Sequence, residues 1–415
     1  MSRTESPNSD RTQVVSVLIV TYQTPPEMLR ECLQSVLDSN YRPLELVIVD
    51  NSPGQLVSDA LEAWMSEQAT HLPTVLFLAQ ARNLGYAGAT NRGIAASHGS
   101  LLLMLNPDAV LQPDTLALLV AASERHPDAV GFAPKVLLRG FDWTLDSIGL
   151  DLYLRGQAGQ CGLGEPDLGQ YDVEERITGL CFAAALIRRS AFRAEEVGPL
   201  DDHYFMFYED VDWSMRASMQ GRAFWTVPEA RVRHIHSAST RAMRGSFKTR
   251  LIQRNLIWTA AKNLERRRVA RSVTGHLVRT ILSGVRGRHF WTALRTVLEG
   301  AMGVPWLVRA RRDAQRRRVL PDRRVLAESR KVSSFDTHKY QPIPSPEVLV
   351  TAISRLYATA PNPVLGRLAL QLTLAAETSM MLNAPQLAEM VRRSGLEITP
   401  ALEWTLRSLE IGSVT

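Results

Sequence analysis

The chain has 415 residues, enough for two or three hydrophobic cores. Its 45% hydrophobic and 22% charged residues are usual for a soluble globular protein and exclude a mostly disordered chain, a collagen-like chain and a small disulfide scaffold. Three widely spaced cysteines without a C-x-x-C pair argue against disulfides and zinc clusters and favour a reducing cytosol. No apolar run approaches the roughly 18 residues of a membrane span. Residues 1–13 lack the apolar core of a signal peptide, so we expect a disordered tail there and a cytoplasmic protein.

The net charge of +6 is unevenly distributed along the chain. The stretch from Lys262 to Lys331 holds 19 Lys and Arg against 5 Asp and Glu, so it carries +14 and the remainder carries −8. A basic segment attached to an acidic body suggests a polyanionic partner, either a membrane surface or a nucleic acid.

Strand-like and helix-like segments alternate over the first 130 residues. Four short apolar runs are expected to be strands: Val14–Thr21, Leu44–Asp50, Thr74–Ala79 and Leu101–Leu105. Helical patterns lie between them, first after Pro25 and Pro26, then over Gln55–Gln68 and Tyr86–Ser97. This order predicts an α/β fold with a mostly parallel sheet and flanking helices. In such sheets ligands bind beyond the carboxyl ends of the strands.

The middle of the chain is less regular, and the remainder favours helices. Residues 138–175 predict a long loop with short hairpins, and residues 178–188 are apolar and buried. A helix is expected over Met206–Met219 and a strand near Ala223–Val227. We expect Arg-rich helices over residues 250–326, interrupted by Gly284, Gly287, Gly303 and Pro305. The predicted divisions are a basic amphipathic helical segment (263–332), a proline-containing linker (333–346) and a small all-helical module (347–415).

Two of the predicted strands are followed by an aspartate. Asp50, at the end of the second strand, can accept hydrogen bonds from a nucleoside. Asp108, in Asn106-Pro107-Asp108 after the fourth strand, can hold Mg²⁺ or Mn²⁺ against a diphosphate, because hard cations prefer carboxylate oxygen. Each aspartate has a plainer alternative as a turn or helix-capping residue.

A glycine-rich segment precedes the helix between the third and fourth strands. Its sequence, RNLGYAGATNRG over residues 82–93, permits close backbone approach and presents free N–H groups to a diphosphate, with Arg82 adding positive charge. The segment lacks the G-x-G-x-x-G spacing of dinucleotide sites.

Three carboxylates lie within four residues at the start of a predicted helix. Glu209, Asp210 and Asp212 can be favoured there by the helix dipole alone, or their mutual repulsion can raise the proton affinity of one to that of a general base. Further on, His234 and His236 can ligate a metal or serve a structural role.

Together these motifs resemble the family 2 glycosyltransferases of the GT-A fold, and specifically their rhamnosyltransferase-like branch. The matching strings are VSVLIVTYQTP, LELVIVDNSP, NLGYAGATNRGI, LLMLNPDAVL, GLCFAAALIRR, FMFYEDVDWSMR and RHIHSAST. The resemblance covers about residues 14–262, which would form the GT-A glycosyltransferase domain.

The resemblance also implies roles for individual residues. Donor binding falls to Thr21, Asp50, Arg82, Asn83, Gly85, Asn91 and Asn106. Asp108 and His234 become metal ligands, Asp210 the catalytic base, and Glu209, Asp212 and Trp213 acceptor-side or supporting residues. Two positions depart from the usual pattern. Asn106 replaces the first aspartate of the DXD motif, and His236 and Ser237 stand where glycines are usual, so either histidine can be the ligand.

The sequence thus predicts an inverting glycosyltransferase that uses a nucleotide-activated sugar and Mg²⁺ or Mn²⁺. By resemblance the donor is dTDP-rhamnose, with UDP-hexoses left open, and the acceptor is a lipid-linked sugar or a surface polysaccharide. The mixture of Arg with Phe290, Trp291 and Trp306 suits peripheral binding to an anionic membrane, at the inner face of the plasma membrane, or equally packing on the catalytic domain. The alternatives are a nucleotidyltransferase and a nucleic-acid-binding protein. Because the latter leaves the strand-end motifs unexplained, we expect no nucleic-acid partner.

Overall fold

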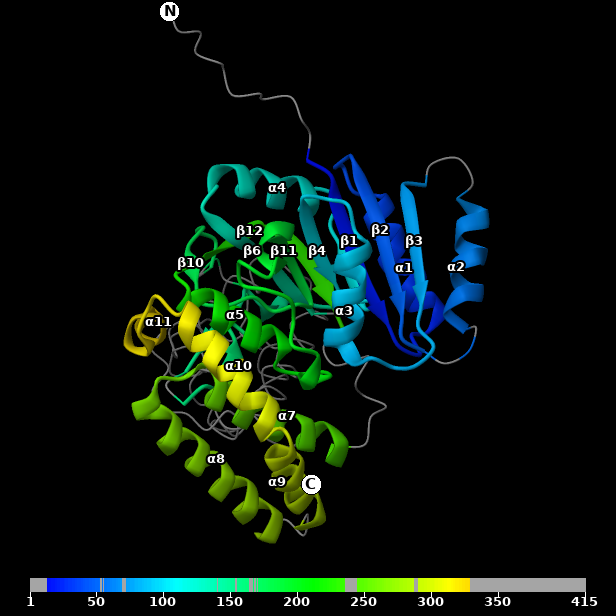
Figure 1. Ribbon diagram of the computed structural model, residues 1–415. Helices are drawn as coiled ribbons and strands as arrows, with labels where there is room; N and C mark the ends of the chain where they lie inside the picture. The colour runs from blue at the N-terminus through cyan, green and yellow to red at the C-terminus, as the bar shows by residue number, and fades with distance from the viewer. Residues whose placement is uncertain are drawn as a thin grey trace, which may run out of the picture.

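The computed structural model describes residues 13–328, apart from 53, 55, 69–71, 140, 154, 164–166, 168, 170, 236–244 and 287–289. The predicted linker (333–346), the predicted module (347–415), His236 and all but the last residue of the predicted tail lie outside the described residues. A β-sheet crosses the molecule with helices on both faces, and helices from the second half of the chain pack beside it (Figure 1).

The bounds of the elements are as follows. The strands are β1 (Val15–Thr21), β2 (Leu44–Asp50), β3 (Thr74–Ala79), β4 (Leu101–Leu105), β5 (Ala109–Leu111), β6 (Ala129–Leu138), β7 (Phe141–Ser147), β8 (Leu150–Leu152), β9 (Ala158–Gln160), β10 (Arg176–Ile177), β11 (Ala184–Arg188) and β12 (Ala223–His234). The helices are α1 (Pro26–Leu37), α2 (Leu56–Glu67), α3 (Gly85–Ala96), α4 (Thr115–Arg125), α5 (Glu209–Met219), α7 (Gly245–Asn263), α8 (Arg266–Arg286), α9 (Phe290–Met302), α10 (Val304–Arg317) and α11 (Asp322–Glu328), with 3₁₀ turns η1 (Arg189–Phe192) and η2 (Asp202–Tyr204).

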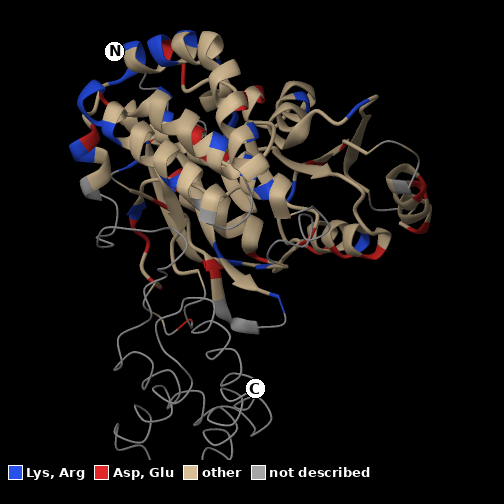
Figure 2. Ribbon diagram, turned by 90° about the horizontal axis from the view of Figure 1, so that it is seen from below, with Lys and Arg blue, Asp and Glu red and all other residues tan. Residues whose placement is uncertain are grey.

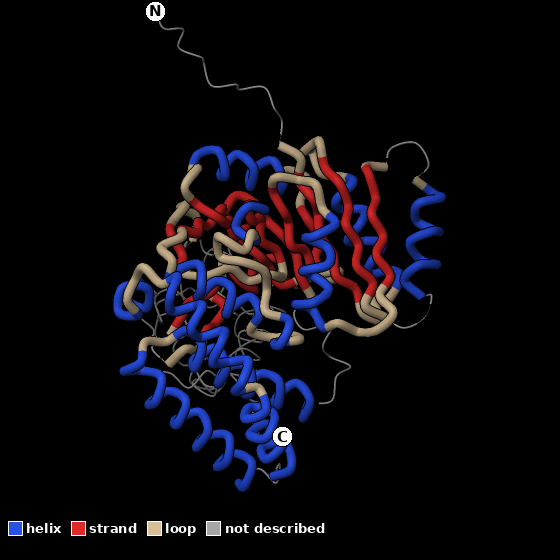
Figure 3. The backbone as a smooth tube through the Cα atoms, in the orientation of Figure 1, coloured by secondary structure: helices blue, strands red, loops and turns tan. Residues whose placement is uncertain are grey.

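The main sheet has the strand order β10-β12-β6-β11-β4-β1-β2-β3. The four strands predicted near the N-terminus are confirmed, and β3, β2, β1 and β4 are mutually parallel. The sheet is mixed beyond them, because β11 runs antiparallel to both β4 and β6. The predicted loop over 138–175 contains β7, which pairs with β6, and the small β8–β9 hairpin (Figure 3).

Both faces of the central strands are covered, which explains their continuous apolar sequences. In β1, Val15, Val17 and Ile19 enter a core formed with α1, α2 and α4. The alternate residues Leu18 and Val20 enter a second core formed with α3 and α5 on the opposite face. Alternate residues of one strand therefore enter two different cores, one on each face of the sheet.

Two predicted details of the helices are wrong. The helix expected over Met206–Met219 begins at Glu209, because Phe207 and Tyr208 adopt positive φ angles of 65° and 70° that a right-handed helix excludes. Gly284 lies inside α8 and does not interrupt it. The interruption expected at Gly303 and Pro305 is present, because α9 ends at Met302 and α10 begins at Val304, with Pro305 in its first turn, where a missing N–H removes no helical hydrogen bond.

The later helices pack directly on the first domain. Leu264, Val325 and Leu326 share a hydrophobic cluster with Val211 and Met215 of α5. Helix α7 contacts α8, α9 and α10, and so links them to the sheet region. None of the described helices combines the length and apolar character needed to cross a membrane.

Candidate active site

A cavity of about 490 Å³ opens at the carboxyl ends of the parallel strands. Its walls come from the ends of β1, β2 and β4 and the residues after them, the start of α3, the β8–β9 hairpin, residues 181–183, the 205–211 segment, the end of β12 and Ile252 of α7. Seven predicted site residues line it: Asn83, Gly85, Asn106, Asp108, Glu209, Asp210 and His234. These residues are separated by up to 151 positions in the chain, and the sheet topology brings them together.

Thr21 and Asp50 lie behind the cavity wall. The Thr21 hydroxyl and the Ser52 backbone N–H both donate to Oδ1 of Asp50, each at 3.0 Å, and both predicted residues are buried. Their neighbours Tyr22 and Asn51 line the cavity instead. The predicted donor-binding pair therefore fixes the turn that presents those neighbours.

Asn51 is a residue that the sequence interpretation passed over. Its side-chain amide donates to Gly85 O (2.9 Å), and its Oδ1 accepts from Leu84 N (3.0 Å), so it holds the glycine-rich turn against the end of β2. The signal was present in the string LELVIVDNSP, in which Asn51 directly follows Asp50.

Gly85 is required by a close approach between the α3 turn and the 205–208 segment. It has φ of 73°, and a Cβ there would lie 2.3 Å from Phe205 O. Phe205, Phe207 and Tyr208 also have positive φ, which is costly for aromatic residues. The buried Asn255 of α7 stabilises this backbone by donating to the carbonyls of Tyr204, Met206 and Phe207 at 2.7–3.0 Å.

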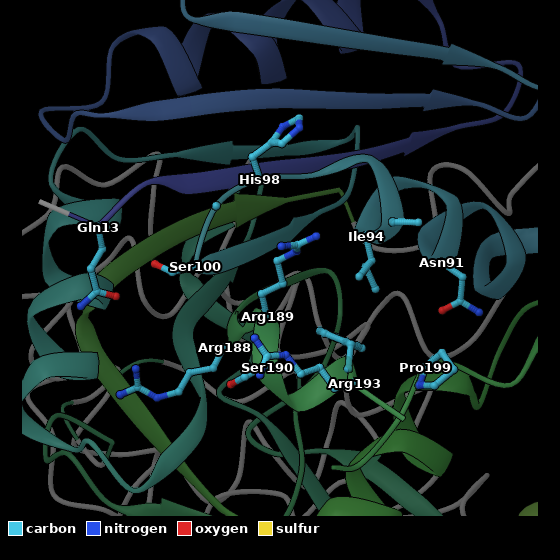
Figure 4. Close-up of a pocket in the computed structure, with 13 residues that line it drawn as sticks. Gln13, Asn91, Ile94, His98, Ser100, Arg188, Arg189, Ser190, Arg193 and Pro199 are labelled. Atoms are coloured by element: carbon cyan, nitrogen blue, oxygen red, sulfur yellow. The ribbon is translucent and has the colours of Figure 1, made fainter. Parts of the chain in front are cut away.

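Arg82 and Asn91 do not line the cavity. Arg82 is exposed outside it. Asn91 lies farther along α3, and its amide donates to Leu200 O (2.8 Å) and Asp202 Oδ1 (2.6 Å). It borders a second cavity of about 670 Å³, where Figure 4 shows it on the same side as Ile94, opposite Arg188. Neither residue lies beside the other predicted donor-binding residues at this cavity, because only the first turn of α3 reaches the strand ends.

The wall at the strand ends carries a chain of charged groups formed by Asp108, His234 and Asp146. His234 Nδ1 is 2.6 Å from Asp146 Oδ2, and His234 Nε2 is 3.2 Å from Asp108 Oδ1. The strand register causes this meeting, since β5 pairs with β12 and places Ala109 opposite His234. Burial lowers the pKa of His234, but the two carboxylates outweigh it and raise the pKa to about 10.

Asp146 is a second residue that the sequence interpretation missed. It is fully buried in β7, within the stretch predicted to be a loop, and no local motif marks it. Its position beside Nδ1 orients the ring so that Nε2 faces Asp108, as outer carboxylates orient metal-ligating histidines.

The three adjacent carboxylates at the start of α5 diverge, as their helical spacing predicts. Glu209 and Asp210 line the cavity. Burial raises the pKa of Asp210 to about 6, although the Val211 N–H donates to its Oδ1. Burial and the adjacent Asp210 raise the pKa of Glu209 well above its usual range, and Glu209 Oε2 has no hydrogen-bond partner within the described part of the chain.

Asp212 points to the protein interior. It accepts from Lys262 (2.9 Å), Arg216 (3.0 Å), Asn263 (2.8 Å) and the Tyr204 hydroxyl (3.1 Å). Burial opposes its ionisation, but Lys262 and Arg216 lower its pKa to about 2. Trp213 is also buried and donates its indole N–H to Gly198 O (2.9 Å). Both predicted supporting residues therefore tie α5 to its neighbours.

The side chains at the strand ends supply only some of the ligands that a hard divalent cation needs. Within the described ranges no cluster of three or more His, Cys, Asp or Glu side chains is arranged to hold a metal. Asp108 and His234 supply two side chains at the cavity wall. Two protein ligands fit a cation such as Mg²⁺, which usually completes its coordination with substrate phosphates and water.

Comparison with known proteins identifies the family. The sequence model described as Glycosyl transferase family 2 matches residues 16–194. The chain is 30% identical over 253 residues to the N-acetylglucosaminyl-diphospho-decaprenol L-rhamnosyltransferase of Mycobacterium tuberculosis, covering 55% of this chain and 78% of that protein. The chain belongs to glycosyl transferase family 2. The predicted resemblance, the GT-A fold and the assignment as a glycosyltransferase are thereby confirmed.

Other relatives of this family 2 glycosyltransferase are more distant. It is 26% identical over 234 residues to the O-antigen biosynthesis protein RfbC of Myxococcus xanthus, which covers 54% of this chain and 18% of that protein. A solved structure of GalNAc-T7 with UDP, GalNAc and Mn²⁺ aligns with a TM-score of 0.49 and 17% identity, over 61% of this chain and 48% of that one.

Proposed function

We propose that this glycosyltransferase moves a sugar from a nucleoside-diphosphate donor to a lipid-linked or polysaccharide acceptor in cell-surface glycan synthesis, with inversion at the anomeric carbon. The observation that carries the proposal is one cavity with two different walls. Asp108 and His234 stand on the strand-end wall, and Glu209 and Asp210 stand at the start of α5. The names of the relatives, which concern a lipid-linked acceptor and O-antigen synthesis, support the acceptor class.

Asp210 is proposed as the base. The acceptor hydroxyl transfers its proton to a carboxylate oxygen of Asp210 while the hydroxyl oxygen attacks the anomeric carbon from the side opposite the diphosphate. A carboxylate with a pKa of about 6 is mostly ionised at neutral pH and more basic than an exposed aspartate. General-base catalysis of this kind contributes roughly 10²- to 10⁴-fold to the rate.

Asp108 and His234 are proposed to hold a divalent cation, Mg²⁺ or Mn²⁺, and binding would require His234 Nε2 to release the proton that its raised pKa otherwise retains. When bound, the cation supplies positive charge that neutralises the departing diphosphate. Asp146 keeps the His234 ring oriented, and Asn106, whose Nδ2 is 3.3 Å from His234 Nε2, borders the same place. The strand-end wall therefore stabilises the negative charge of the diphosphate, while the α5 wall accepts the proton of the acceptor hydroxyl.

The donor is proposed to be dTDP-rhamnose, which the rhamnosyltransferase relative supports. Asn83 and Gly85 line the donor side of the cavity, and Thr21 and Asp50 shape it from behind. UDP-hexoses are the alternative, because no described side chain selects one base or sugar by a contact.

A donor screen tests the proposal. The full chain is incubated with dTDP-rhamnose, UDP-hexoses or GDP-hexoses and a polyprenyl-diphosphate N-acetylglucosamine acceptor, and the released nucleoside diphosphate and the glycosylated lipid are measured. We expect dTDP and a rhamnosylated lipid, with an inverted linkage. Release of pyrophosphate would indicate a nucleotidyltransferase, and transfer only from another donor would overturn the rhamnose assignment.

A further inference from the structure

Helix α8 buries polar side chains and exposes apolar ones along much of its length. At its centre it buries Ser272, His276 and Thr280, which recur every four residues on one side. Ser272 Oγ donates to Arg155 O (2.6 Å), and His276 Nε2 is 3.0 Å from the same oxygen. A helix that packs on a protein core and faces water normally does the opposite. These polar contacts and the partly buried Val273 hold α8 in place, while four apolar residues of its second half face outward: Val278, Ile281, Leu282 and Val285.

The exposed apolar residues concentrate on α8, α9 and α10. Fourteen large hydrophobic side chains are exposed among the described residues, and eleven of them lie between 278 and 308. We call these eleven the apolar face: Val278, Ile281, Leu282, Val285, Phe290, Trp291, Leu294, Leu298, Met302, Val304 and Val308. Trp291 and Met302 are 77% and 79% exposed, although α9 buries the polar Thr296. So large a concentration on one helical group marks an interaction surface.

The same helices are strongly basic. Side chains of Arg266, Arg267, Arg271, Arg309, Arg312 and Arg316 are exposed on α8 and α10. Figure 2 shows Lys and Arg positions along the helical part of the molecule. Exposed apolar and aromatic residues combined with arginines suit the boundary between anionic headgroups and acyl chains, where Trp is also favoured.

We propose that the apolar face docks on an anionic membrane, with the arginines of α8 and α10 binding lipid phosphates. The proposal rests on the proposed function in one respect, because docking would present a lipid-linked acceptor to the active site. Helix α7 provides the connection, since it packs against α8, α9 and α10 and its Ile252 lines the cavity.

Vesicle binding by the full chain tests the proposal. Co-sedimentation is measured with vesicles of phosphatidylcholine alone and of phosphatidylcholine mixed with phosphatidylglycerol, at low and high salt. We expect binding to the anionic vesicles that weakens with salt, by about fivefold for each arginine replaced by glutamine. The double variant Trp291→Glu, Leu298→Glu should bind at least about tenfold more weakly. Val173→Glu is the matched control, because Val173 is 74% exposed but lies outside the helical group.

The remaining outcomes overturn the proposal. Equal binding to both kinds of vesicle, no binding to either, or full binding by the double variant would each do so. If the double variant unfolds more readily than Val173→Glu, residues 329–415 or another part of the chain cover the face. If it converts a dimer to a monomer, a second copy covers it. Transfer to a soluble acceptor analogue without vesicles should be unchanged, so failure of docking is distinguished from failure of the proposed function.

Discussion

The two walls of the cavity treat charge in opposite ways. At the strand ends, Asp108 and Asp146 contact His234 and raise its pKa to about 10, so the wall stabilises ionised groups. At the start of α5, Glu209 is buried and Asp210 is half-buried, no cationic side chain among the described residues bonds to either, and their pKa values rise. Carboxylates of the same type therefore differ in their chemistry according to the groups that surround them. The strand-end wall is suited to a diphosphate, and to a cation once His234 has released its proton, whereas the α5 wall is suited to accepting a proton.

The largest effect should follow the loss of charge at the strand-end wall. Asp108→Ala removes the carboxylate proposed to hold the cation, so we expect transfer to fall by about 10³-fold, the scale of lost electrostatic stabilisation. Released nucleoside diphosphate measures turnover, and circular dichroism checks that the fold is retained. Near-full activity in saturating Mg²⁺ or Mn²⁺ would remove Asp108 from the metal site.

Removing Asp212 should affect stability before catalysis. Asp212→Asn leaves the buried Lys262 and the half-buried Arg216 beside a neutral side chain, and breaking such a pair costs about 3 kcal/mol in the free energy of unfolding. Chemical denaturation measures this loss. Because the folded-state pKa of Asp212 is lowered to about 2, its contribution is present at neutral pH and is lost as pH falls below about 4. A variant as stable as the wild type would show that the network is not stabilising.

Asp146 should act through His234. Asp146→Asn keeps the size of the side chain but weakens the orientation of the ring, so we expect a 10- to 100-fold loss of metal affinity or activity. Measuring activity against metal concentration separates a loss of metal affinity from a loss of intrinsic activity. Activity that is lost through weaker metal binding should be recovered at higher metal concentration. An unchanged metal dependence would indicate that Asp146 serves only to pack β7.

The pH dependence should report the α5 wall. Because the pKa of Asp210 is raised to about 6, the base is ionised above that pH and protonated below it. We expect kcat to fall about tenfold for each pH unit below 6 and to level off towards neutral pH. A profile that stays flat down to pH 4.5 would mean that no group with a raised pKa acts as the base.

The sequence predicted the parallel strands well because each is a short apolar run covered on both faces. It also placed Asp108, His234 and Asp210 at one site through an ordered set of motifs. It could not find Asp146, whose partner is 88 residues away and is brought close by strand pairing. Only the family resemblance singled out Asp210 among the three carboxylates, because which of them faces the cavity depends on where α5 begins and on the position of Lys262. The apolar face was left undecided for a similar reason, since residue composition alone does not show which side of a helix is buried.

The central claim is that Asp210, and not its neighbour Asp212, accepts the proton. The most direct measurement is kcat for Asp210→Asn and Asp212→Asn side by side, each normalised to the folded fraction, with donor affinity measured separately. We predict that Asp210→Asn lowers kcat at least about a hundredfold with donor binding little changed. Asp212→Asn should retain most of the activity of its folded fraction. If the folded Asp212→Asn protein is inactive while Asp210→Asn keeps most of its turnover, the assignment of the base is contradicted.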